Sequence, residues 1–116
     1  MRKLFCGILG FAFLCAPVIA FAHPASDIKF DYNAGEKTLK ITVIHGSRDI
    51  SKHFIDTINV TIDGMKMIEQ TFMSQFDAKG QEVSYIVIDV KEKSKVKVDT
   101  HCCKGGDLSK EILIEG

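Results

Sequence analysis

The chain has 116 residues, with 15 basic and 15 acidic side chains and a formal net charge of zero. This length predicts one domain, and a hydrophobic content of 46% with eight Phe excludes a disordered or low-complexity chain. The balanced charge argues against a nucleic-acid-binding protein, because such a protein needs a net basic face. The composition therefore favours a small globular domain.

The N-terminus is typical of a signal peptide. Met1-Arg2-Lys3 is a short basic start, residues 4–19 form a nearly unbroken apolar run, and Ala20-Phe21-Ala22 is typical of a cleavage site. We predict a signal peptide over 1–22 and a mature domain over 23–116.

Two other interpretations of this segment are disfavoured. The apolar run is short for a transmembrane anchor, and Leu14, which is not a small residue, precedes Cys15 where a lipoprotein signal needs small residues. No later stretch is long or apolar enough to cross a bilayer. We therefore expect a protein of the periplasm or the cell exterior, without membrane association after cleavage.

The rest of the chain predicts β-strands throughout. Alternating apolar and polar residues predict strands, in chain order, over 28–32, 39–44, 54–62, 65–72, 83–90, 96–102 and 112–114. Asp63-Gly64 is a hairpin signal, because both positions of such a turn need a positive φ. Residues 64–76 are also compatible with a short helix. Seven short strands indicate an all-β fold, an antiparallel β-sandwich of immunoglobulin-like type.

The predicted mature domain contains two cysteines, Cys102 and Cys103, which are adjacent. Exported small domains usually use separated cysteine pairs that join loops, and neighbouring residues cannot do this. A ligand or a reactive thiol is therefore favoured over a structural disulfide. The alternative is one buried cysteine and one without a role.

Counting strand directions brings the histidines and these cysteines to one end of the sandwich. Antiparallel strands alternate in direction, so the start of the first strand, the end of the second, the start of the third and the end of the sixth coincide. These positions hold His23, His45, His53 and His101, the last followed by the two cysteines.

The alternation of side chains gives their expected directions. His45 shares the face of the apolar residues of its strand, and Cys102 shares that of Val96 and Val98. His101 and Cys103 are expected to point the other way. Imidazole and thiolate donors suit iron, copper or zinc. The predicted metal ligands are His23, His45, His53, His101, Cys102 and Cys103.

Several short segments resemble one family. Lys52-His53-Phe54-Ile55-Asp56-Thr57-Ile58 is similar to its Lys-His-Tyr-Ile-x-x-Ile run, and His23-Pro24 resembles its first ligand region. His45 precedes His53 as a second ligand does, and Cys102 or Cys103 followed by Gly105-Gly106 resembles the closing Cys-Asn-x-His-Gly motif, with Gly105 at the histidine position. The family is that of desulfoferrodoxin and the superoxide reductases (neelaredoxins). The resemblance implies an immunoglobulin-like sandwich whose ferrous iron has four imidazoles, one axial thiolate and an open position for superoxide.

Three interpretations of function remain open. The first is a non-haem iron protein that reduces superoxide by one electron, with a protein electron donor. The second is a copper-binding module in which a mature N-terminal His23 chelates copper through its amine and imidazole, completed by His45 or His53. The third is a non-metal interaction module that has lost the site, as Gly105 suggests.

Overall fold

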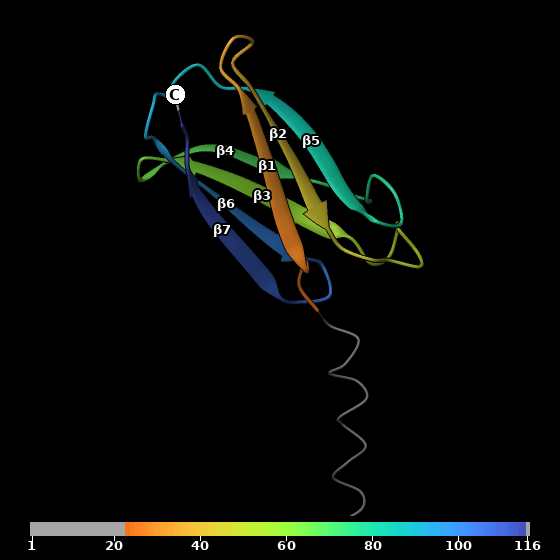
Figure 1. Ribbon diagram of the computed structural model, residues 1–116. Helices are drawn as coiled ribbons and strands as arrows, with labels where there is room; N and C mark the ends of the chain where they lie inside the picture. The colour runs from red at the N-terminus through yellow and green to blue at the C-terminus, as the bar shows by residue number, and fades with distance from the viewer. Residues whose placement is uncertain (1–22, 116) are drawn as a thin grey trace, which may run out of the picture.

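The computed structural model describes residues 23–115, which fold into seven antiparallel strands (Figure 1). The predicted signal peptide lies outside the described residues. The strands are β1 (Asp27–Asn33), β2 (Thr38–Ile44), β3 (Ile55–Ile62), β4 (Met65–Thr71), β5 (Gly80–Ile86), β6 (Lys95–Cys102) and β7 (Asp107–Leu113). In this part of the chain, no helix has the length and apolar character needed to cross a membrane. The all-β prediction is confirmed.

Two sheets form the sandwich. One has the strand order β1-β2-β5 and the other β4-β3-β6-β7, and all their pairings are antiparallel. The chain crosses from one sheet to the other after β2, after β4 and after β5, because the next strand in each case belongs to the other sheet. Apart from β4, which lies beside β3 rather than in the first sheet, the strands are distributed as in a seven-stranded sandwich of immunoglobulin-like type.

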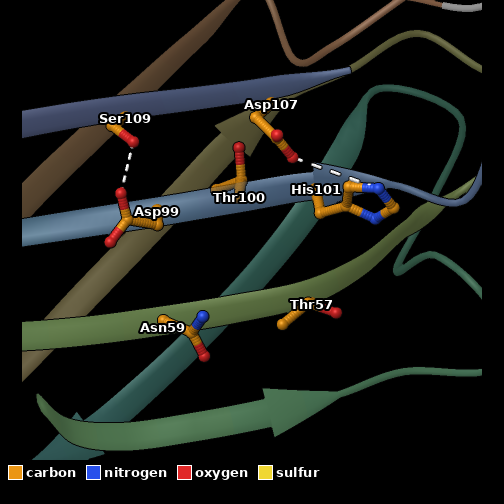
Figure 2. Close-up of a pocket in the computed structure, with 7 residues that line it drawn as sticks. All are labelled: Thr57, Asn59, Asp99, Thr100, His101, Asp107 and Ser109. Atoms are coloured by element: carbon orange, nitrogen blue, oxygen red, sulfur yellow. Dashed lines mark hydrogen bonds and ion pairs between the residues drawn. The ribbon is translucent and has the colours of Figure 1, made fainter. Parts of the chain in front are cut away.

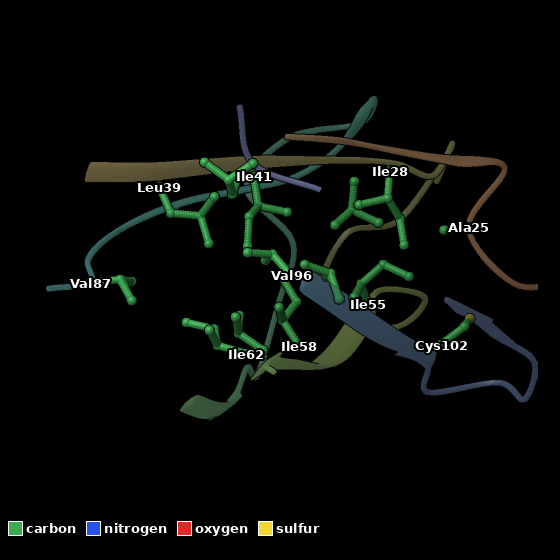
Figure 3. Packing of buried hydrophobic residues seen from close by; sticks show 14 residues of the cluster. Ala25, Ile28, Leu39, Ile41, Ile55, Ile58, Ile62, Val87, Val96 and Cys102 are labelled. Atoms are coloured by element: carbon green, nitrogen blue, oxygen red, sulfur yellow. The ribbon is translucent and has the colours of Figure 1, made fainter. Parts of the chain in front are cut away.

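The core lies between the sheets and follows the period of two in each strand. In β6 the residues from Lys95 to Cys102 alternate between exposed or half-buried and buried, because one face covers the core and the other faces solvent. Figure 3 shows the buried aliphatic side chains of both sheets meeting between them. Nine of them are 0% exposed: Ile28, Leu39, Ile41, Val43, Ile55, Ile58, Val60, Val96 and Val98.

The hairpin between β3 and β4 is the predicted one. Asp63 and Gly64 have φ values of 49° and 87°, the left-handed pair that a two-residue turn of this type requires. The helix alternative over 64–76 is wrong where β4 pairs with β3, from Met65 to Thr71. Met65 and Met67 have a spacing that is also compatible with a helix, but backbone hydrogen bonds to β3 make this segment the edge strand β4.

Two strands differ from the predicted bounds by more than one residue at an end, and β5 also ends at Ile86 rather than at residue 90. β5 begins at Gly80 rather than residue 83, because Gly80 pairs with Ile44, and a Cβ there would lie 1.8 Å from the carbonyl oxygen of Val43. Glycine is a poor strand former, so the sequence hides this start. β7 begins at Asp107 rather than residue 112, since an edge strand with polar exposed residues gives a weak apolar signal.

The strand directions bring five chain positions to one end of the sandwich. The start of β1, the end of β6 and the start of β7 lie together at the lower end in Figure 1. The pairing of Ile55 with Cys102 puts the start of β3 there too, and β2 ends where β1 begins, at the pair Ile44 and Asp27. This end therefore holds the candidate site.

Candidate metal centre

Three imidazoles from separate segments converge at this end. The ring centroids of His23 and His45 are 4.9 Å apart, and His53 lies 4.8 Å from each of them. One nitrogen from each ring belongs to a group of possible ligand atoms that all lie within 4.8 Å of one another. His23 precedes β1, His45 follows β2 and His53 precedes β3, so the strand directions alone account for their meeting.

Two of these imidazoles have a buried nitrogen without a partner. The Nε2 atoms of His45 and His53 are both inaccessible to solvent and make no hydrogen bond. Such orphaned polar atoms are uncommon in folded proteins, because each costs about 1–3 kcal/mol. A metal ion bound between the rings would satisfy both nitrogens, so the residues present fit a metal.

Hydrogen bonds at the opposite ring nitrogens define the tautomers. His45 Nδ1 lies 2.8 Å from Oε1 of Gln75, and His23 Nδ1 lies 3.1 Å from the carbonyl oxygen of Pro24. Both oxygens only accept, so each Nδ1 carries the proton and donates it. The Nε2 lone pairs of both rings are therefore free to bind a metal.

The surroundings of two of the imidazoles, His45 and His53, lower the pKa of each and so favour its neutral form. Burial is the main cause that lowers the pKa of His45, opposed by its hydrogen bond to Gln75. Burial also lowers the pKa of His53, and the neighbouring His45 and His23 lower it further. Because a metal competes with protons for the same lone pairs, lowered pKa values leave the ligands ready at neutral pH.

Local packing holds His23 and His53 in place. A Cβ on Gly106, whose φ is 104°, would lie 2.7 Å from the nitrogen of Pro24 and 3.1 Å from the carbonyl carbon of His23. The loop after β6 thus presses on the His23–Pro24 backbone through a position where only glycine fits. His53 closes a tight turn, in which its N–H donates to the carbonyl oxygen of Asp49 at 2.9 Å.

The two cysteines have different surroundings. Cys102 is fully buried among core residues, as its strand position predicted, and its Sγ lies 3.4 Å from the backbone nitrogen of Lys104. Burial raises the pKa of the Cys102 thiol, and backbone N–H groups of the following loop oppose the shift. Cys103 is half-buried, and its Sγ lies 3.4 Å from both the nitrogen of Phe54 and the carbonyl oxygen of Lys52. The Cys103 thiol therefore contacts both residues that flank His53.

His101 lies on the outer face of the four-stranded sheet, as its parity predicted. Its Nδ1 is 2.8 Å from Oδ1 of Asp56. Its Nε2 is 4.0 Å from Oδ1 of Asp107, a contact that Figure 2 marks. The hydrogen bond to Asp56 raises the pKa of His101. Of the six predicted ligands, the structure thus groups His23, His45 and His53, places both cysteines at the same end, and turns His101 away.

An open depression gives access to the centre from solvent. It has a volume of about 750 Å³, and the imidazoles of His23 and His53 form part of its wall. Arg48 and Lys104 also line it, together with Asp49, whose carboxylate accepts hydrogen bonds from Ser51. The depression therefore presents two cations and one carboxylate beside two candidate ligands.

Sequence reasoning missed the residues that position the imidazoles. Gln75 holds His45, and Gly106 packs against His23–Pro24. Gln75 lies in a loop between β4 and β5 with no periodic pattern, so no sequence signal places it beside His45. Gly106 is one of two adjacent glycines, and such a pair predicts a turn but not the contact with His23–Pro24.

Comparison with known proteins leaves the family of the chain open. No protein-family model and no curated protein matches the sequence. Among solved structures, the chain is similar to the superoxide reductase (neelaredoxin) from Ignicoccus hospitalis, with 15% sequence identity and a TM-score of 0.49. The similarity covers 78% of this chain and 82% of that one. At this level it carries no argument about chemistry, so the candidate centre rests on its own geometry.

Proposed function

We propose that this chain is an exported metalloprotein that binds non-haem iron through His23, His45 and His53 and reduces superoxide by one electron. The observation that carries the proposal is the pair of buried, unpartnered Nε2 atoms of His45 and His53, with His23 completing the group. Three imidazoles are borderline donors that suit iron, and they leave coordination positions open for a small ligand.

One of the two cysteines at this end of the sandwich, Cys102 or Cys103, would complete the donor set. The backbone nitrogen of Lys104 lies 3.4 Å from the sulfur of Cys102, and the sulfur of Cys103 lies 3.4 Å from both residues that flank His53. Backbone N–H groups stabilise a thiolate, and a thiolate ligand tunes the electronic properties of an iron centre. No fourth imidazole joins the group among residues 23–115, since Gly105 occupies the histidine position of the motif and His101 faces the outer surface.

The depression suits an anionic substrate. Arg48 and Lys104 would attract superoxide by their charge and hold it beside His23 and His53. Iron held by His23, His45 and His53 would supply one-electron reduction, in which superoxide, one electron and two protons from solvent would give hydrogen peroxide. A donor protein would replace the electron.

The two other interpretations are less well supported. An N-terminal His chelates copper through its amine and its own Nδ1, but Nδ1 of His23 donates to the Pro24 carbonyl oxygen. A non-metal interaction module leaves the unpartnered Nε2 atoms of His45 and His53 without an explanation. The geometry therefore favours metal binding through Nε2.

The test combines metal content with reaction stoichiometry. We expect one iron per chain after anaerobic loading with iron(II), lost in His53→Ala and kept in His101→Ala, because His101 lies outside the imidazole group. With a reductant present, reduction yields one peroxide per superoxide consumed, whereas dismutation yields one per two. Equal iron in the protein and in His53→Ala would refute the site, and dismutation stoichiometry would refute the reductase activity.

A further inference from the structure

The side chain of Gln75 uses every hydrogen-bonding position that it has near the centre. The residue is 3% exposed. Its Oε1 accepts from His45 Nδ1 at 2.8 Å and from the backbone nitrogen of Ile55 at 3.1 Å. Its Nε2 donates to the carbonyl oxygens of His45 and Asp77, both at 2.9 Å. A buried amide with four partners has one orientation.

The backbone partners determine which atom of the Gln75 amide faces His45. A flipped amide would set its NH₂ group against the N–H of Ile55 and its oxygen against two carbonyl oxygens. Three hydrogen bonds would become repulsive contacts, so Oε1 faces the ring. Because the oxygen can only accept, the proton of the neutral His45 ring must lie on Nδ1. The Nε2 atom then carries no proton and has a free lone pair.

We infer that Gln75 is a positioning residue, which fixes His45 in the Nδ1–H tautomer and aims its Nε2 lone pair at the metal. The tautomer follows from the hydrogen bonds of the metal-free protein, whereas the effect on metal binding rests on the proposed function. Outer partners of this kind typically change metal affinity 10–100-fold when they are removed.

Gln81, in β5, provides a matched comparison because its side chain binds the same loop. Its Oε1 accepts from the backbone nitrogen of Phe76 at 2.7 Å, and its Nε2 donates to the carbonyl oxygens of Ile55 and Ser74, both at 3.0 Å. Like Gln75, it is 3% exposed and ties the loop between β4 and β5 to β3. Its hydrogen bonds involve backbone groups and leave His45 untouched, so loss of Gln81 disturbs the loop without removing the acceptor at Nδ1.

The first measurement needs no variant. Long-range ¹H–¹⁵N spectra of the metal-free protein report which nitrogen of each imidazole carries the proton. We expect His45 to be protonated at Nδ1 in the neutral state. Protonation at Nε2 would overturn the inference, whatever the protein does with metals.

The second measurement compares Gln75→Leu with Gln81→Leu. In Gln75→Leu we expect loss of the Nδ1–H signature of His45 and a 10–100-fold weaker affinity for zinc(II), used as a redox-inert probe. In Gln81→Leu the signature persists, and zinc affinity changes less. An unchanged signature in Gln75→Leu would overturn the inference. A correct tautomer in a protein that binds no metal would refute the proposed function while the role of Gln75 in holding His45 stands.

Discussion

Gly106 offers a direct test of how the loop after β6 holds His23. Gly106→Ala adds one methyl group at a position with a φ of 104°. The backbone strain alone costs about 1–3 kcal/mol of folding free energy. In addition, the new Cβ would lie 2.7 Å from the nitrogen of Pro24, a separation that real Cβ atoms essentially never show, so backbone must move. We expect His23 to shift away from the other two imidazoles.

Gly64 supplies the matched control for this strain. Its φ is 87°, it lies in the hairpin between β3 and β4, and a Cβ there would meet no heavy atom within 4 Å. Gly64→Ala should therefore lose stability only by the cost of the backbone strain, about 1–3 kcal/mol, without disturbing His23. Urea denaturation measures the stability of both variants, and calorimetric titration with zinc(II) measures their affinity.

The two glycine variants should separate in metal binding. Displacing one of three imidazoles should weaken zinc binding in Gly106→Ala by at least the 10–100-fold typical of lost supporting contacts, about 1.4–2.8 kcal/mol. Gly64→Ala should bind like the unmodified protein. Equal affinities in the two variants would refute the reasoning, because His23 would then be either no ligand or not held by this contact.

Two predictions concern pH. Because burial lowers the pKa of His45 and His53, the unfolded chain binds protons below about pH 6.5 that the folded, metal-free chain does not, so its stability should fall on acidification through that range. Urea denaturation on either side of that pH checks this, and a flat profile would contradict it. Asp56→Asn should lower the raised pKa of His101 in an imidazole NMR titration, and an unchanged midpoint would contradict the pairing. The pair of His101 and Asp56 is partly exposed, so it adds at most about 1 kcal/mol to the folding stability. This contribution is present while His101 is protonated and is lost as the pH rises through the pKa of His101 in the folded protein.

The sequence is sufficient to predict which residues reach the end of the sandwich. Strand direction reverses at each turn. His45 and His53 therefore meet across the loop between β2 and β3, and counting the strands from β3 to β6 brings Cys102 to the same end. Parity also predicts that His45 faces inward and His101 outward. These inferences succeed because a period of two and an antiparallel order are properties of the backbone rather than of particular contacts.

The sequence is not sufficient to predict how the site is held. The hydrogen bond between Gln75 and His45 joins two loops that no periodic pattern places, and the close approach of Gly106 to Pro24 depends on how the sheets are stacked. The sequence does not predict the starts of β5 and β7 for a similar reason. Gly80 and the polar residues of β7 have little strand preference of their own, and backbone pairing with the neighbouring strand places them in the sheet. Tertiary contacts, which local residue preferences do not encode, determine all of these features.

The distribution of the imidazoles over the two sheets ties metal binding to folding. His23 and His45 flank strands of the β1-β2-β5 sheet, whereas His53 leads into β3 of the other sheet. In the metal-free protein their convergence leaves two buried nitrogens unpartnered, each at a cost of about 1–3 kcal/mol. A ligand that binds only the folded state stabilises it by about 2.7 kcal/mol at a concentration 100 times its Kd. A metal at this centre would therefore join the sheets at the end where the unpartnered nitrogens weaken the metal-free fold.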